Sequence, residues 1–161
     1  MAGAPPAWKS SATGPRINHS VETAMKTTTT FIDDYKYRSV TESGAAVEIE
    51  ISAAGADSGH QSPTELLLSA LSACSSVDLV QMLKKRRKTV NGLTVAAEGE
   101  RREDHPRAFT HIRLTFTVES PDVEQAEFEK LGHLAATKYC SVAGTLNATM
   151  DHTFEIVRPG V

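Results

Sequence analysis

The stretch SPTELLLSALSACSSVDLVQML, residues 62–83, decides the fold because it has the length and composition of one long apolar helix. Ser62 is a favoured N-cap residue, and Pro63 fits the first position of a helix. Glu65 can return a hydrogen bond to the Ser62 amide, which completes a capping box. We predict that the helix ends near Arg87, in a run of five basic residues that complement the negative end of the helix dipole.

The apolar part of this stretch, residues 66–83, is nearly long enough to cross a bilayer. It also contains four serines, Gln81 and Asp78. An aspartate costs about 2.5–3.5 kcal/mol at the centre of a bilayer. We therefore predict the buried helix of a soluble protein and no membrane partner.

The segments around the helix alternate between apolar and polar residues, which is the period of half-buried strands. The expected strands cover residues 31–40, 47–51, 93–100, 112–118 and 154–156. The charged residues 101–107 are expected to join the third and fourth of these as a hairpin. A second helix should begin at Ser120-Pro121-Asp122, and a short helical piece should follow Tyr139. This order of elements predicts an α+β fold.

The length of 161 residues suits one domain with its own core. Residues 1–24 are rich in Pro, Gly, Ala and Ser, so we predict a flexible N-terminal extension followed by a domain over 25–161. A formal net charge of −3 gives no field that would attract nucleic acid. Two cysteines cannot form a disulfide scaffold, and residues 1–20 contain no apolar run of signal-peptide length. We expect a reducing, cytoplasmic location.

The two cysteines are the candidate reactive groups. Cys74 lies in the middle of the apolar helix, and Cys140 follows the second helix. If Cys140 begins a new helical turn, the helix dipole would lower the pKa of its thiol. A thiolate can attack a peroxide and become a sulfenic acid, which a second thiol converts to a disulfide. Either cysteine could equally be a buried packing residue, since free cysteines are often buried.

Several blocks of the sequence resemble the OsmC/Ohr superfamily of hydroperoxide-resistance and osmotically inducible proteins. Residues 62–74 resemble its first-cysteine motif, and residues 75–80 with 83–85 are similar to the YhfA-like subgroup. Residues 101–103 and 106–112 resemble the hairpin of that subgroup, and 138–142 its second-cysteine motif. The blocks occur in the family's order, and the resemblance covers about residues 26–157.

The resemblance implies an intertwined homodimer in which antiparallel sheets pack on long central helices. It implies thiol-dependent reduction of organic hydroperoxides during oxidative or osmotic stress, without a cofactor or metal. Cys74 would be the peroxidatic residue and Cys140 the resolving one. Relatives of the Ohr branch are regenerated by dihydrolipoyl groups, so a dithiol is the expected reductant.

The chain departs from the Ohr pattern around the reactive cysteine. The activating glutamate of Ohr proteins directly follows the motif's proline, where this chain has Thr64, with Glu65 next. Nine residues separate Glu65 from Cys74, which places them on opposite helix faces, so capping explains Glu65 better. Arg38 is the candidate for the activating arginine. Asp78, one turn after Cys74, would oppose thiolate formation or act as a base or orienting group.

These departures leave three functions open. The first is a hydroperoxide reductase. The second is a non-catalytic small-molecule-binding or redox-sensing protein, in which the cysteines line a pocket or report oxidation. The third is a protein in which both cysteines are inert parts of the core. The histidines show no spacing typical of a metal site.

Overall fold

The computed structural model describes residues 25–51 and 59–160, and within them the predicted α+β fold is confirmed. The elements in chain order are β1 (Thr27–Asp33), β2 (Lys36–Thr41), β3 (Ala46–Glu50), α1 (Pro63–Lys85), β4 (Gly92–Arg101), β5 (Phe109–Glu119), α2 (Gln125–Leu134), the π-helical turn η1 (Ala135–Tyr139), α3 (Ser141–Thr145) and β6 (Thr149–Val157). The predicted extension 1–24 lies outside the described residues.

Helix α1 begins with the predicted capping box. The Glu65 amide donates to the Ser62 hydroxyl at 3.3 Å, and the Ser62 amide donates to the Glu65 carboxylate at 2.7 Å. The helix ends at Lys85, two residues before the predicted end. The left-handed backbone of Arg87, with φ of 61°, then turns the chain away.

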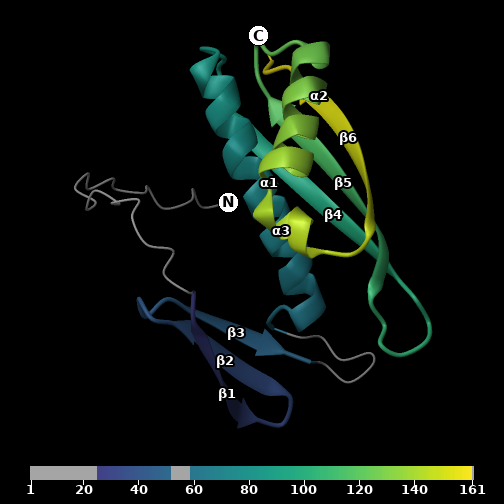
Figure 1. The fold of residues 1–161 in the computed structure, drawn as a ribbon. Coiled ribbons are helices and arrows are strands. Elements are labelled where there is room, and N and C mark those ends of the chain that lie inside the picture. Colours follow the sequence, from purple (N-terminus) through teal and green to yellow (C-terminus); the bar gives the residue numbers. More distant parts are fainter. Residues whose placement is uncertain (1–24, 52–58, 161) are drawn as a thin grey trace.

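Strands β4, β5 and β6 form the sheet that carries the core. Strands β4 and β5 are the predicted antiparallel hairpin, paired from Gly92↔Glu119 to Arg101↔Phe109. The expectation of antiparallel sheets is met by β1–β3 and by the β4–β5 hairpin, whereas β6 runs parallel to β5. The reason is the crossover through α2, which returns the chain to the end of the sheet where β5 begins, so that β6 runs in the same direction as β5. Figure 1 shows α1 and α2 on the same face of this sheet.

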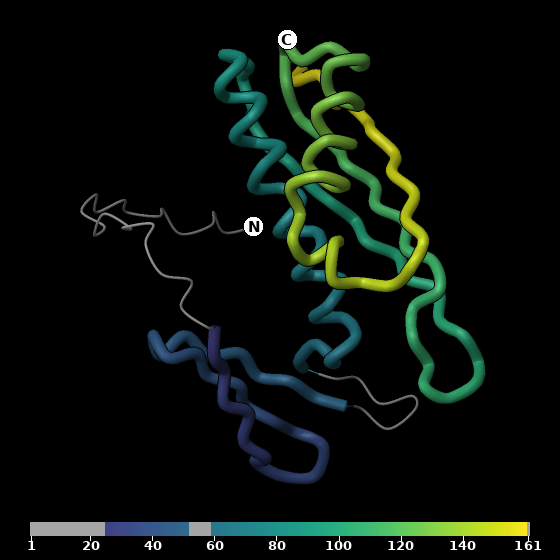
Figure 2. Tube along the Cα trace, in the orientation of Figure 1, coloured from purple at the N-terminus to yellow at the C-terminus, as the bar shows by residue number. Residues whose placement is uncertain are grey.

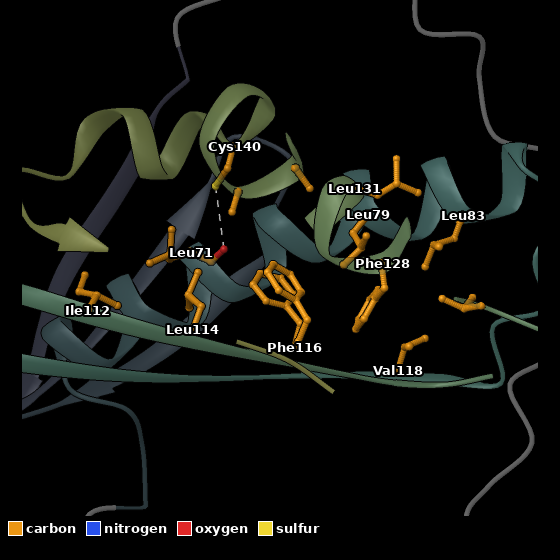
Figure 3. Packing of buried hydrophobic residues seen from close by; sticks show 14 residues of the cluster. Leu71, Leu79, Leu83, Ile112, Leu114, Phe116, Val118, Phe128, Leu131 and Cys140 are labelled. Atoms are coloured by element: carbon orange, nitrogen blue, oxygen red, sulfur yellow. Dashed lines mark hydrogen bonds between the residues drawn. The ribbon is translucent and has the colours of Figure 1, made fainter. Parts of the chain in front are cut away.

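The core lies between these helices and the sheet. The inward residues of β5 are fully buried, as their alternation predicted: Ile112, Leu114, Phe116 and Val118. They meet Leu71, Leu79 and Leu83 of α1 and Phe128 of α2 (Figure 3). Sheet and helices therefore share one hydrophobic cluster.

The start of α2 differs from the prediction. Ser120 and Asp122 do not cap the helix, which begins at Gln125. The Ser120 hydroxyl accepts from the amide of Val123 at 3.1 Å, and the Asp122 carboxylate accepts from the amide of Thr89 at 2.9 Å. These residues tie the start of the crossover to the segment after α1.

Strands β1–β3 form a separate antiparallel sheet in the order β1-β2-β3. This sheet lies apart from β4–β6, near the start of α1 (Figures 1 and 2). Large apolar side chains remain exposed on it, among them Phe31, Tyr35 and Val47. The N-terminal sheet is therefore not covered by the described part of the same chain.

Helix α1 is covered on one side only. It is long and apolar enough to span a membrane by composition, with mean hydropathy 1.6 over an 18-residue window, but core helices share these properties. Only 22% of that window is buried within the described chain. Leu67 and Val77 are 43% and 56% exposed. An apolar face of α1 is thus left open.

Gly132 of α2 allows the helix to approach β6 closely. A Cβ at this position would overlap the ring of Phe154. Phe154 has little room to move, because it stacks on Phe116 at 5.1 Å and meets Phe128 edge-on at 5.5 Å between ring centroids. The absence of a side chain at Gly132 therefore sets the distance between helix and sheet.

We expect Gly132→Ala to lower the free energy of unfolding by about 1–3 kcal/mol, the cost of overpacking a core. Gly144→Ala is the matched control, because a Cβ at Gly144 would meet no atom within 4 Å. Denaturant unfolding of both variants checks this. Equal stability of Gly132→Ala and the parent chain would contradict it.

His152 of β6 is a half-buried titratable group behind α2. Its Nε2 atom has no hydrogen-bond partner among the described residues, and its ring packs edge-on against His133 at 5.4 Å. Burial lowers the pKa of His152, and the charge of His133 lowers it further, while Asp151 acts in the opposite direction. His152 therefore binds a proton less readily in the folded chain than in the unfolded chain.

We expect the free energy of unfolding to fall as the pH drops below about 6.5, the ordinary pKa of histidine, because the unfolded state then binds more protons. The loss should level off below the folded-state pKa. His152→Phe should flatten this pH dependence, whereas His105→Asn in the exposed hairpin should retain it. Unfolding curves between pH 5 and 8 measure both, and an unchanged slope in His152→Phe would refute the explanation.

Candidate active site

Cys74 lies on α1 at the border between the buried and open sides of the helix. Its thiol is partly exposed and faces the start of α3, where the Ser141 hydroxyl lies 3.9 Å from its sulfur. The sulfur also receives hydrogen bonds from the backbone of Val142 and Ser141 and from the thiol of Cys140. The structure thus brings together two cysteines that are 66 residues apart in the sequence.

Cys140 is positioned by the π-helical turn at the end of α2. Its amide donates to the carbonyl of Ala135 at 3.0 Å, and its extended backbone makes it the N-cap of α3. The amide of Ala143 donates to its sulfur at 3.3 Å. Cys140 is only 4% exposed, and its sulfur points toward the Leu71 carbonyl oxygen, 4.0 Å away (Figure 3). Cys140 is therefore fixed against the middle of α1.

The pKa of the Cys74 thiol is lowered from its ordinary value. Partial burial acts against this, and it is outweighed by hydrogen bonds from the Val142 backbone, the Cys140 thiol, and the Ser141 hydroxyl and backbone. Each of these groups donates to the sulfur and so stabilises its negative charge. Cys74 is the cysteine that the surroundings favour as a thiolate.

The pKa of the Cys140 thiol is raised, so the sequence-based expectation of a lowered value was wrong. Cys140 does begin a helix, as assumed, but burial disfavours its charge, and the neighbouring Cys74 raises its pKa further. The Ala143 amide and Ser75 act in the opposite direction without overcoming burial. Desolvation therefore outweighs the start of a five-residue helix.

Ser75 is a buried polar residue next to this pair. It is 0% exposed, and its hydroxyl has no partner at hydrogen-bonding distance among the described residues. Its dipole nevertheless lowers the pKa of Cys140. Ser75 is thus a buried polar group beside Cys140.

The three other candidate residues lie away from these contacts. Glu65 is held in the capping box, where hydrogen bonds from the Ser62 side chain and backbone lower its pKa. Arg38 lies in the N-terminal sheet and pairs with Glu48 at 3.6 Å. Asp78 is half-buried on α1, and the hydrogen bonds that lower the pKa of Cys74 do not come from it. Their proposed activating or orienting roles gain no support from the fold of one chain.

This arrangement can perform thiol chemistry. One sulfur is favoured as thiolate and reachable from solvent, and a neutral thiol lies beside it. Both cysteines are free thiols in the structure. The described residues contain no group of three or more His, Cys, Asp or Glu side chains that could hold a metal ion.

Comparison with known proteins agrees with this thiol pair. The model of the family described as OsmC-like protein matches residues 55–155, which include both cysteines. The chain belongs to the OsmC-like family. The chain is 42% identical to Protein YhfA of Escherichia coli strain K12 over 98 residues, which are 60% of this chain and 73% of YhfA. The resemblance seen in the sequence is therefore confirmed.

Two solved structures place this OsmC-like chain within the same fold. An OsmC-like protein from Mycoplasma pneumoniae has a TM-score of 0.70 and 16% identity, over 87% of this chain and 100% of that one. The organic hydroperoxide resistance protein OhrB of Bacillus subtilis has a TM-score of 0.57 and 16% identity, over 85% and 100% of the two chains. At these identities the likeness shows the shared fold.

The sequence identified both cysteines of this OsmC-like site but missed the groups that surround them. Ser141 and Val142 appeared only as part of a motif, because their role depends on amides that α3 leaves free at its start. Ser75 follows a cysteine in a helix of many serines, and nothing in its spacing marks it. Contacts between α1 and α3 define these roles.

We expect Cys74 to react with iodoacetamide several times faster than Cys140 near pH 7, because thiolates are the reacting species and Cys140 is buried. Mass spectrometry of the reduced protein after short exposures measures both sites. Ser141→Ala should slow the labelling of Cys74 by removing one of the groups that lower its pKa, whereas Ser43→Ala, in the turn between β2 and β3, should not. Faster labelling of Cys140 would contradict the assignment.

Proposed function

We propose that this protein is a thiol-dependent hydroperoxide reductase in which Cys74 attacks the substrate and Cys140 resolves the product. The observation that carries the proposal is the pair of adjacent thiols with opposite pKa shifts. Membership of the OsmC-like family supports it, because a neighbour of the same fold is named as an organic hydroperoxide resistance protein.

The first step is attack by the Cys74 thiolate on the terminal oxygen of a hydroperoxide ROOH. The O–O bond breaks, the sulfur is oxidised to a sulfenic acid, and RO⁻ leaves and takes a proton to become the alcohol ROH. The groups that stabilise the thiolate, the Ser141 hydroxyl and the amides of Ser141 and Val142, remain next to the oxidised sulfur.

The second step uses the neutral thiol beside it. Cys140 loses its proton and attacks the sulfenic sulfur, which forms a disulfide and releases water. An external dithiol, such as a dihydrolipoyl group, then reduces this disulfide by exchange and is itself oxidised to a disulfide. Burial of Cys140 protects it from direct oxidation, so one cysteine meets the peroxide and the other closes the cycle.

A homodimer is part of the proposal. The open apolar face of α1 and the uncovered N-terminal sheet are surfaces that a second copy would bury. A chain that uses a thiol reductant also requires a reducing compartment, so we propose a cytoplasmic location.

A second candidate is a redox sensor that is oxidised once and does not turn over. One observation favours it: the carboxylate of Glu65 is engaged in the capping box instead of in the thiol site. The two functions differ in stoichiometry. A sensor consumes about one peroxide per chain, whereas a reductase continues while a dithiol is supplied.

We expect Cys74→Ser to abolish peroxide consumption in the presence of excess dithiol, because no other described thiol is favoured as a thiolate. Cys140→Ser should still consume one peroxide per chain and accumulate a sulfenic acid, which dimedone labelling and mass spectrometry detect. Loss of two protons from the oxidised parent chain would mark the disulfide.

Lys130→Ala, on the exposed side of α2, serves as a control away from the thiol pair and from the open face of α1. Undiminished turnover by Cys74→Ser would exclude the proposed reductase. Turnover that stops after one equivalent in the parent chain, with dithiol present, would favour the sensor.

A further inference from the structure

A cavity of about 620 Å³ lies beyond the thiol pair, between the start of α1, the β4–β5 hairpin and the segment after α3. Its apolar lining includes Leu67, Phe109 and Leu146. Two arginines of the hairpin, Arg102 and Arg107, also line it. The volume lies within the range of small-molecule sites, which combine apolar walls with a few charged groups.

The hairpin holds both arginines in place. The Nε atom of Arg107 donates to the Glu103 carbonyl at 3.2 Å, and the Nε atom of Arg102 donates to the Pro106 carbonyl. These bonds fix one edge of each guanidinium on the backbone. The remaining N–H groups are the fork that binds carboxylates in two-point contacts.

Neither arginine has a partner of opposite charge in the described part of the chain. The described ion pairs of other arginines are with Glu48, Glu98 and Glu127. No acidic residue is among those that line the cavity, whose uncharged polar residues are Thr64, Thr110, Asn147 and Thr149. The cavity therefore has one basic end without a counter-charge, next to an apolar wall.

The cavity is connected to the thiol site by two elements. Leu67 precedes Cys74 by seven residues on α1, which places it on the same side of the helix, about 10 Å away along the axis. Leu146 directly follows α3, whose first residue, Ser141, contacts Cys74. A molecule with its anionic end at the arginines and its chain along the leucines would extend toward the Cys74 sulfur.

We propose that Arg102 and Arg107 bind the carboxylate of an aliphatic acid whose chain occupies this cavity. With the proposed reductase function, on which this step rests, the preferred substrate is a hydroperoxide that carries a carboxylate at the far end of its aliphatic chain. The apolar wall selects the chain, and the two guanidinium groups select its charged end.

Binding of octanoate tests this site without any peroxide chemistry. We expect calorimetry to show binding of octanoate to the full chain and much weaker binding of octan-1-ol, which has the same length and no charge. Arg102→Gln/Arg107→Gln should weaken octanoate binding by about tenfold or more. Arg113→Gln is the matched control, since Arg113 lies on the same hairpin, pairs with Glu98 at 3.5 Å and does not line the cavity.

Cys74→Ser/Cys140→Ser should bind octanoate as the parent chain does, so the site can be confirmed even if the reductase proposal fails. If the reductase proposal holds, the double glutamine variant should lower kcat/KM for a carboxylate-bearing hydroperoxide relative to cumene hydroperoxide by a similar factor. Equal binding of octanoate and octan-1-ol, or of octanoate by the parent and the double glutamine variant, would overturn the proposal. An affinity for inorganic phosphate equal to that for octanoate would also overturn the proposal, because the aliphatic chain of octanoate would then contribute nothing to binding.

Discussion

The site depends on the contact between the middle of α1 and the start of α3. Leu71 and Ser75 face the core at this level, and Cys74 lies between them in sequence at the edge of the buried side. Cys140 sits against the Leu71 carbonyl, which places the free amides of α3 over the Cys74 sulfur. A shift of α3 would remove both the second thiol and the donors of the first. The packing of the core thus determines the chemistry of the surface sulfur.

The two thiols differ because burial and hydrogen bonding act on them unequally. Burial is the largest single influence on Cys74 and raises its pKa, but the donors from Val142, Cys140 and Ser141 together outweigh it. Cys140 also accepts a backbone hydrogen bond, from Ala143, but its burial outweighs this bond and its pKa rises. The π-helical turn contributes to the difference, because it ends α2 so that Cys140 points inward.

Local patterns predicted most of the fold. The capping box of Ser62 and Glu65 and the alternation of β5 depend on neighbours in sequence, and both are confirmed. The parallel pairing of β6 was missed because it follows from the crossover of α2. The prediction that Ser120 and Asp122 cap the second helix failed for a related reason. Their side chains accept hydrogen bonds from the amides of Val123 and Thr89 instead. The cysteines were recognisable as a pair, but their pKa order depends on burial, which no spacing encodes.

Cys74 lies next to the open apolar face of α1, so whatever covers that face also changes the surroundings of the Cys74 sulfur. Leu67 and Val77 are exposed above and below Cys74 along the same helix, so the chain leaves apolar surface on both sides of the Cys74 sulfur. Burying such surface is favourable by about 25 cal/mol per Å², which supports the homodimer proposed above. A second copy on this face would form an outer wall beside Cys74 and withdraw it further from water. The donors around the sulfur would then act in a less polar medium, where each hydrogen bond to the thiolate is stronger. Assembly and reactivity would in this way depend on the same helix face.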